Sequence, residues 1–231
     1  MPLALVITAA GINCDAELVE AFELAGATVE TVHLNVLLER PARLETAGLI
    51  GVPGGFSYGD AIAAGRIMAQ LIRRRLYDAF VDCIRHGTLI IGPCNGFQIL
   101  VQAGLLPGPA PGEPWPDTPP APTVALRPNR SGLFTDRWTR VETPASTVCR
   151  WTAPPIGDAT LDVLPSAHGE GRLHADPALL DTLAADGRIA VTYHPDDNFN
   201  GSARAVAGLC DGSGQVFGLM PHPERYVNWD Q

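Results

Sequence analysis

The sequence predicts an α/β fold with a mostly parallel central sheet, helices on both faces and short antiparallel strands in the C-terminal half. Apolar runs of strand length alternate with helix-patterned segments through the N-terminal half, an order typical of parallel sheets with right-handed crossovers. Short strand-like segments separated by turns follow. The chain has 231 residues, 46% of them hydrophobic, so it can bury a substantial core, and we expect one domain over 1–231.

The N-terminal half shows strands and helices in turn. Each expected strand is an apolar or β-branched run, and they lie at 3–8, 28–34, 48–52 and 88–91. Each expected helix has apolar residues at helical spacing, and they lie at 15–25, 65–85 and 97–103, with Asp15 as the first N-cap. Ligands bind such sheets at the carboxyl ends of the strands, which are the positions after residues 52 and 91.

The C-terminal half begins with a proline-rich surface excursion at about 107–122, where prolines exclude both a helix and a central strand. Short strands are expected after it, at 123–126, 138–142, 147–151, 161–164 and 189–193. A hairpin is expected between 203–209 and 215–220, around a glycine-containing turn, and a short helix over 177–185.

Composition and charge exclude several classes of function. The net charge of −9 argues against nucleic acid or an anionic membrane as partner, and we place Arg73-Arg74-Arg75 on a solvated helix face. All 16 basic residues are arginine, which excludes a Walker A lysine and a lysine Schiff base.

The cysteines indicate a reducing compartment. Five is an odd number, and their scattered positions show no metal-type pairing, so we expect free thiols and no metal site. The N-terminus has no basic flank, and no apolar stretch reaches membrane-spanning length. We therefore expect a cytoplasmic protein.

The segment around Cys94 has the pattern of a nucleophile elbow. Gly92 and Gly96 stand two residues before and after Cys94, between an apolar strand and a helix, where a sharp turn leaves no room for side chains. The positive end of the following helix points at the sulfur and favours the thiolate. The alternative is a buried structural cysteine.

Two adjacent glycines follow the expected strand at 48–52. Gly54 and Gly55 allow backbone N–H groups to approach a ligand closely, and we expect the N–H groups of Gly55 and Asn95 to form an oxyanion hole. The alternative is a plain tight turn.

A base for Cys94 is expected at the end of the hairpin. Pro223 imposes an extended conformation on His222, so His222 and Glu224 project to the same side and Glu224 can orient the imidazole. His194 is an alternative base, and His168 lies in a glycine-punctuated stretch that is either a ligand loop or a turn.

Seven segments spread over the chain resemble the class I, triad-type glutamine amidotransferases, and within them the glutaminase subunits of phosphoribosylformylglycinamidine synthases. The elbow and His222-Pro223-Glu224 are shared across class I. The segments specific to these subunits are Gly54-Gly55-Phe56-Ser57-Tyr58-Gly59-Asp60, Cys94-Asn95-Gly96-Phe97-Gln98 and His168-Gly169-Glu170-Gly171-Arg172. The other matches are Gly11-Ile12-Asn13-Cys14-Asp15, Asn129-Arg130-Ser131-Gly132-Leu133-Phe134 and Asn200-Gly201-Ser202. Pro93 and Phe199 depart from the family pattern.

The resemblance implies a reaction and its residues. Cys94 would attack the carboxamide of L-glutamine, His222 would protonate the departing ammonia, Glu224 would orient His222, and water would hydrolyse the glutamyl thioester. The resemblance also implies that Gly54, Gln98, His168 and Gly169 contact glutamine.

The resemblance implies partners as well. In this family the ammonia passes to a separate synthetase subunit that uses ATP and Mg and converts formylglycinamide ribonucleotide to formylglycinamidine ribonucleotide in de novo purine biosynthesis, and a small subunit helps assembly. No cofactor is expected on this chain. The alternatives are a subunit of another class I amidotransferase, a cysteine hydrolase or peptidase of the same fold, and a non-catalytic binding module.

Overall fold

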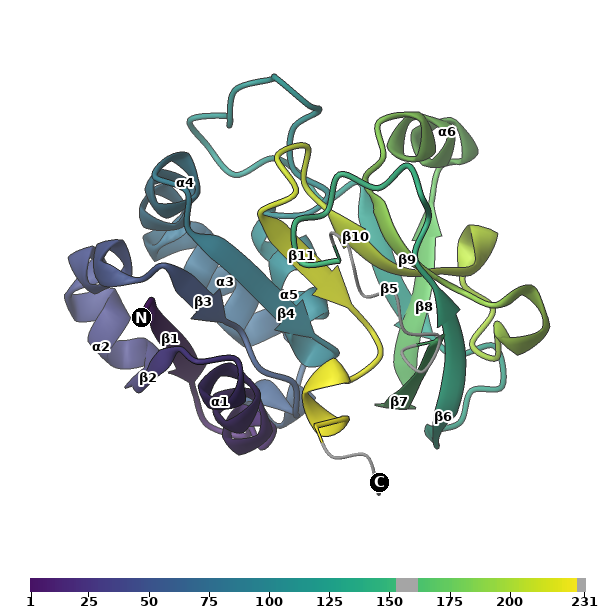
Figure 1. Ribbon diagram of the computed structural model, residues 1–231, viewed down its shortest axis with the longest axis horizontal. Coiled ribbons are helices and arrows are strands. Elements are labelled where there is room, and N and C mark those ends of the chain that lie inside the picture. Colours follow the sequence, from purple (N-terminus) through teal and green to yellow (C-terminus); the bar gives the residue numbers. More distant parts are fainter. Residues whose placement is uncertain (153–161, 228–231) are drawn as a thin grey trace.

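One mixed sheet organises the computed structural model, which describes residues 1–152 and 162–227. Its strand order within these residues is β2-β1-β3-β4-β11-β10-β9-β6-β7 (Figure 1), parallel from β2 to β11 and antiparallel from β11 to β7. The parallel strands are β1 (Leu3–Thr8), β2 (Thr28–His33), β3 (Leu49–Gly51), β4 (Leu89–Pro93) and β11 (Val216–Leu219). The antiparallel strands are β10 (Val206–Cys210), β9 (Ile189–Tyr193), β6 (Thr135–Glu142) and β7 (Val163–His168). The predicted α/β class is confirmed.

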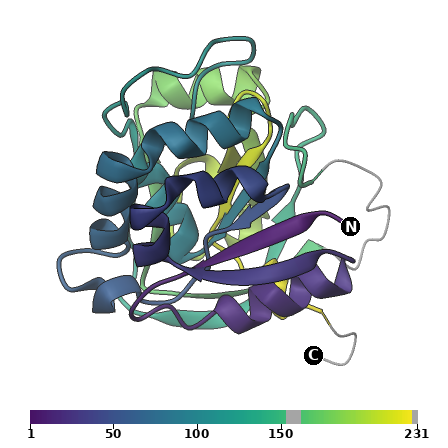
Figure 2. The same ribbon diagram turned by 90° about the vertical axis from the view of Figure 1, so that its left-hand side faces the viewer.

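Helices cover both faces of the parallel half, as predicted. Helix α1 (Asp15–Leu24) packs Leu18 and Phe22 against one face, and the remaining N-terminal helices bury the face that carries Leu5 and Ile7. Figure 2 shows α1 and these helices on opposite sides of the sheet. They are α2 (Leu34–Glu39), α3 (Arg66–Arg75), α4 (Tyr77–Arg85) and α5 (Asn95–Ala103).

The C-terminal half adds a two-stranded ribbon and one helix. Strand β5 (Val124–Pro128) pairs with β8 (Glu170–Ala175) outside the main sheet, and α6 (Pro177–Ala185) coincides with the predicted helix. Strands β10 and β11 form the predicted hairpin.

Several predicted elements are corrected. The helix expected over 65–85 is two helices, because Leu76 leaves helical geometry (φ −127°) and the apolar stripes of α3 and α4 bury separately on either side of it. Cys14 occupies the first N-cap, and Asp15 is already helical. Segment 147–151 forms no strand; Val148 and Arg150 make single hydrogen bonds to the loop residues Gly187 and Gly214. The start of the strand expected at 161–164 lies outside the described residues, and β7 begins at Val163.

The proline-rich excursion forms neither helix nor strand, and Arg73 ties it down. Its guanidinium donates hydrogen bonds to the carbonyls of Pro119 and Pro120 at 2.8 and 2.7 Å. Arg73 is therefore not simply part of a solvated helix face, since it anchors the excursion. Arg74 and Arg75 are exposed as predicted.

Gly96→Ala should destabilise the fold strongly. A Cβ at Gly96 would lie 1.9 Å from the backbone oxygen of Val52, so α5 and the segment that follows β3 would have to separate. We expect a loss of about 3 kcal/mol in the free energy of unfolding, measured by denaturant titration. Gly48→Ala is the matched control, since its Cβ meets nothing closer than 3.4 Å. Equal stability of the two variants would contradict this packing.

Candidate active site

Cys94 stands at the bend between β4 and α5 with a strained backbone. Its φ of 49° and ψ of −108° are rare for a residue with a side chain. A Cβ at Gly92 would lie 2.7 Å from the carbonyl carbon of Gly96, so the bend excludes side chains on both flanks, as an elbow requires. Cys94 is 7% exposed and its Sγ lies 3.8 Å from the carbonyl oxygen of Ala167. Cys94 therefore packs with the buried core residues and keeps only a small part of its surface open to solvent.

Proline at position 93 removes one backbone N–H donor from β4, on the edge that faces β3. The Val52 N–H bonds to the Ile91 oxygen at 2.9 Å, and in a parallel ladder the next bond would come from the N–H of residue 93. Proline lacks that N–H, so the β3–β4 ladder stops there. The Cys94 N–H donates to Leu219 of β11 at 2.7 Å, so the backbone at Cys94 stays anchored.

His222 and Glu224 form a buried pair on the turn η6 (Pro223–Arg225). His222 Nδ1 lies 2.6 Å from Glu224 Oε1, and each side chain is 1% exposed. The His222 N–H donates to the carbonyl of Pro165 at 2.7 Å, which fixes the turn against β7. His222 Nε2 has no hydrogen-bond partner among the described residues, so this nitrogen remains available to a reacting group.

The surroundings of His222 favour its protonated form. Burial lowers its pKa, but the charges of Cys94 and Glu224 and the hydrogen bond to Glu224 outweigh burial and raise the pKa to about 9. The charge of Cys94 thus stabilises the protonated imidazole, which at neutral pH carries a proton that it can give away.

The two predicted oxyanion donors, Gly55 and Asn95, follow the carboxyl ends of the neighbouring strands β3 and β4. A Cβ at Gly54 would lie 3.1 Å from His222 Cε1, so a side chain at this position would press against the imidazole. Gly55 has a φ of +123° and bridges to Ile12 in an antiparallel pair. Asn95 is the first residue of α5, where N–H groups point out of the helix.

Of the predicted glutamine contacts, Gln98 is already engaged within the protein. Its Nε2 donates to the Glu170 carbonyl at 2.6 Å, and its Oε1 accepts from Asn95 Nδ2 at 2.9 Å. Gln98 therefore joins the elbow helix to the segment that contains His168 and Gly169.

His168 is buried beside the pair and neutral. Burial lowers its pKa to about 4, and the charge of His222 contributes. Its Nδ1 lies 3.1 Å from Asn129 Oδ1, while the Asn129 amide nitrogen donates to the carbonyl of His168. This network assigns the proton to Nδ1 and leaves Nε2, which has no partner among the described residues, as an acceptor. The Gly169 carbonyl accepts the Asn129 N–H at 2.8 Å.

Sequence reasoning missed Tyr193, and the alternative base His194 lies at a short turn beside Asp196. Tyr193 on β9 is buried, and burial together with the charge of Cys94 raises its pKa. In the sequence Tyr193 is simply the last residue of an apolar strand, and no local pattern indicates that it lies near Cys94. His194 caps a short turn, where its Nδ1 accepts the Asp196 N–H, and no hydrogen bond links it to Cys94 within the described residues.

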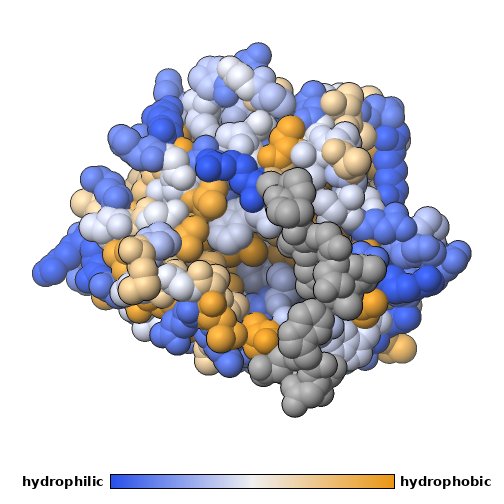
Figure 3. Space-filling view, viewed as in Figure 1, coloured by the Kyte–Doolittle hydropathy of each residue, from blue (hydrophilic) through white to orange (hydrophobic). Residues whose placement is uncertain are grey.

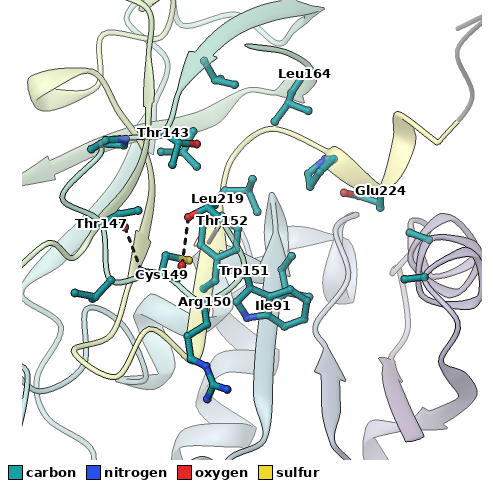
Figure 4. Close-up of a pocket in the computed structure, with 18 of the residues that line it drawn as sticks. Ile91, Thr143, Thr147, Cys149, Arg150, Trp151, Thr152, Leu164, Leu219 and Glu224 are labelled. Carbon is teal, nitrogen blue, oxygen red and sulfur yellow. Dashed lines mark hydrogen bonds between the residues drawn. The ribbon is translucent and has the colours of Figure 1, made fainter. Parts of the chain in front are cut away.

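A cavity of about 880 Å³ lies on the α1 face of the sheet, next to Glu224 of the His222–Glu224 pair. Figure 3 shows that this side of the molecule is hollowed and bordered by apolar residues. Figure 4 shows Ile91, Trp151, Leu164 and Leu219 around the cavity, with Glu224 at its edge. Glu224 lines the cavity whereas Cys94 and His222 are not among the described residues that do, so the cavity meets the site only at the carboxylate.

Comparisons with known proteins all find glutamine amidotransferases or PurQ subunits. A family model described as a CobB/CobQ-like glutamine amidotransferase domain matches residues 1–231. Phosphoribosylformylglycinamidine synthase subunit PurQ of Dehalococcoides mccartyi is 39% identical over 237 residues, covering 98% of this chain and 86% of that protein. The PurQ subunit of Cereibacter sphaeroides is 40% identical over 228 residues, covering 97% and 89%. The solved structure of PurLQS from Thermotoga maritima matches with a TM-score of 0.73 and 33% identity, covering 99% of this chain and 90% of that chain.

The described residues contain neither a cluster of metal-binding side chains nor a membrane-spanning helix. No group of three or more His, Cys, Asp or Glu side chains in 1–152 and 162–227 is placed to hold a metal ion. Within the same ranges, no helix has the length and apolar character needed to cross a membrane.

His222 should titrate near pH 9. Its folded-state pKa lies above the ordinary value of 6.5, so the stability it contributes is fully present below about pH 6.5 and is lost as the pH rises through about 9. We expect this contribution to be on the order of 3 kcal/mol. NMR of the imidazole Cε1–H against pH measures the pKa, and Glu224→Gln should lower it.

The matched control for this titration is Asp196→Asn, which removes a carboxylate from the parallel sequence His194-Pro195-Asp196. It should leave the His222 titration unchanged. A His222 pKa at or below 6.5 in the wild type would contradict the interaction with Cys94 and Glu224.

Proposed function

This chain belongs to the CobB/CobQ-like glutamine amidotransferases as a glutaminase subunit of phosphoribosylformylglycinamidine synthase, and we propose that Cys94, His222 and Glu224 form its catalytic triad. The 2.6 Å bond from the imidazole to Glu224, beside the strained backbone of Cys94, carries this proposal. The same arrangement of sulfur, imidazole and carboxylate is what nucleophilic attack on an amide requires. We propose that residues 1–231 act as one glutaminase domain.

The first half of the reaction follows from the protonation of His222. The Cys94 thiolate attacks the carboxamide carbon of L-glutamine, and an S–C bond forms while the carbonyl oxygen becomes negative. The imidazolium, held protonated at neutral pH, gives its proton to the departing nitrogen, and the C–N bond breaks to release ammonia. Glu224 stabilises the imidazolium and fixes its orientation.

The second half returns the enzyme to its starting state. Neutral His222 takes a proton from water, the hydroxide attacks the glutamyl thioester, and the S–C bond breaks to give glutamate and the thiolate. In both halves the N–H groups of Gly55 and Asn95 are the proposed donors to the oxyanion, because both follow the carboxyl ends of neighbouring strands, β3 and β4.

Gly54, Gln98, His168 and Gly169 are the proposed contacts to the rest of glutamine. The free acceptor Nε2 of His168 suits an N–H of the substrate. Gln98 would have to give up its bond to Asn95 or Glu170 to contact glutamine directly. We propose that it also holds the segment around Glu170 in place.

The proposed partners follow from the Thermotoga maritima PurLQS structure, to which this chain is 33% identical. We propose that a synthetase subunit receives the ammonia, and that it uses ATP and Mg to convert formylglycinamide ribonucleotide, with a small subunit assisting assembly. This chain itself would need no cofactor. The free cysteines support a reducing compartment, and we propose the cytoplasm.

Cys94→Ala should abolish glutamate release from glutamine. Loss of the nucleophile is expected to lower kcat by at least about 10³-fold, measured with the synthetase present. Cys83→Ala, which removes another buried thiol far from the triad, is the matched control and should retain activity. Glutamate release by Cys94→Ala at the wild-type rate would contradict the triad.

The synthetase for formylglycinamide ribonucleotide should stimulate the chain selectively. We expect glutamate release to rise when this synthetase is added and not when a synthetase of another class I amidotransferase is added. A peptidase of the same fold would instead cleave peptides or esters without glutamine. Equal stimulation by unrelated synthetases, or peptide cleavage without glutamine turnover, would contradict the assignment of partner and substrate.

A further inference from the structure

We propose that Cys14 and Arg225 form a positioning pair that holds the His222–Glu224 turn against the glycine loop of the active site. This inference rests on the proposed function. It concerns a buried thiol that takes no part in the mechanism above and whose hydrogen bonds go to Asn13 and Arg225.

The first contact joins α1 to the catalytic turn. Arg225 Nη2 donates to Cys14 Sγ at 2.9 Å, and Cys14 is 2% exposed at the N-cap of α1. The Arg225 N–H also closes the turn by donating to the carbonyl of His222 at 3.1 Å. A shift of the Arg225 guanidinium would therefore disturb the turn that carries His222 and Glu224.

The second set of contacts joins Cys14 to the glycine loop. A Cβ at Gly54 would lie 3.4 Å from Cys14 Sγ and 3.1 Å from His222 Cε1, so the sulfur and the imidazole pack against the same glycine. The Cys14 thiol donates to Asn13 Oδ1 at 3.5 Å, and that oxygen would lie 2.6 Å from a Cβ at Gly55.

Cys14 thus lies where three pieces of the site meet, namely the start of α1, the glycine loop and the catalytic turn. Its thiol remains protonated, since burial raises its pKa to about 11 against the opposing effect of Arg225. A neutral sulfur can accept the guanidinium N–H and donate to Asn13 at once, which alanine cannot do. A serine hydroxyl can do both.

The test measures glutamate release with the synthetase subunit present. Cys14→Ala should lower kcat about tenfold and leave KM for glutamine within about twofold, because the pair places the base and not the substrate. Cys14→Ser should restore most of kcat. Cys83→Ala is the matched control, since Cys83 is an equally buried thiol whose pKa burial also raises to about 11.

Two further measurements keep the test decisive. The His222 pKa should fall in Cys14→Ala, because a displaced imidazole loses its interaction with Cys94, and it should stay near 9 in Cys83→Ala. Arg225→Lys should show the same loss of kcat, and the double variant should lose no more than the worse single variant. Should Cys14→Ala not fold, Arg225→Lys and Cys14→Ser give the kcat comparison.

The outcomes separate two hypotheses. A wild-type chain that releases no glutamate with its synthetase contradicts the proposed function. An active wild type, with Cys14→Ala equal to Cys83→Ala in kcat and in His222 pKa, or with fully additive effects in the double variant, overturns the positioning pair alone.

Discussion

The backbone conformation of Cys94 is the constraint on which the rest of the site depends. Strand β4 must turn into α5 within one residue, and this is possible only because Gly92 and Gly96 allow the strand, the helix and the backbone of Val52 to touch. The strain is held by packing on all sides, since Phe97, Ile99 and Leu100 of α5 are fully buried. The bend places the sulfur and the first N–H groups of α5 at the same end of the sheet.

The neighbouring strand brings the base to this end. Strand β11 pairs in parallel with β4, and Leu219 faces Pro93, so the residues that follow the two strands leave the sheet side by side. Cys94 comes after one strand and His222 after the other, although they are far apart in the sequence. The Pro165 carbonyl on β7 then fixes the backbone of His222 from the antiparallel half. The site therefore lies at the junction of the two halves of the sheet.

The sequence predicts the features that local chemistry decides. Glycines around Cys94 and the extended His222-Pro223-Glu224 segment have local causes, and the structure shows the expected bend and the expected imidazole–carboxylate bond. Features decided by distant contacts were not predictable. The break at Leu76, the absence of a strand at 147–151 and the burial of Tyr193 beside Cys94 depend on what packs against each segment. Likewise, no spacing in the sequence joins Cys14 to Arg225.

The place of β11 in the sheet has a consequence for biosynthesis. Residues 216–219 form the last of the described strands in chain order, yet their strand lies between β4 and β10, with paired neighbours on both sides. A ribosome-bound chain that has exposed only the preceding residues has an open gap at this position and lacks His222 and Glu224. Such a nascent chain lacks two of the three side chains of the proposed triad, so it cannot yet carry out the proposed reaction.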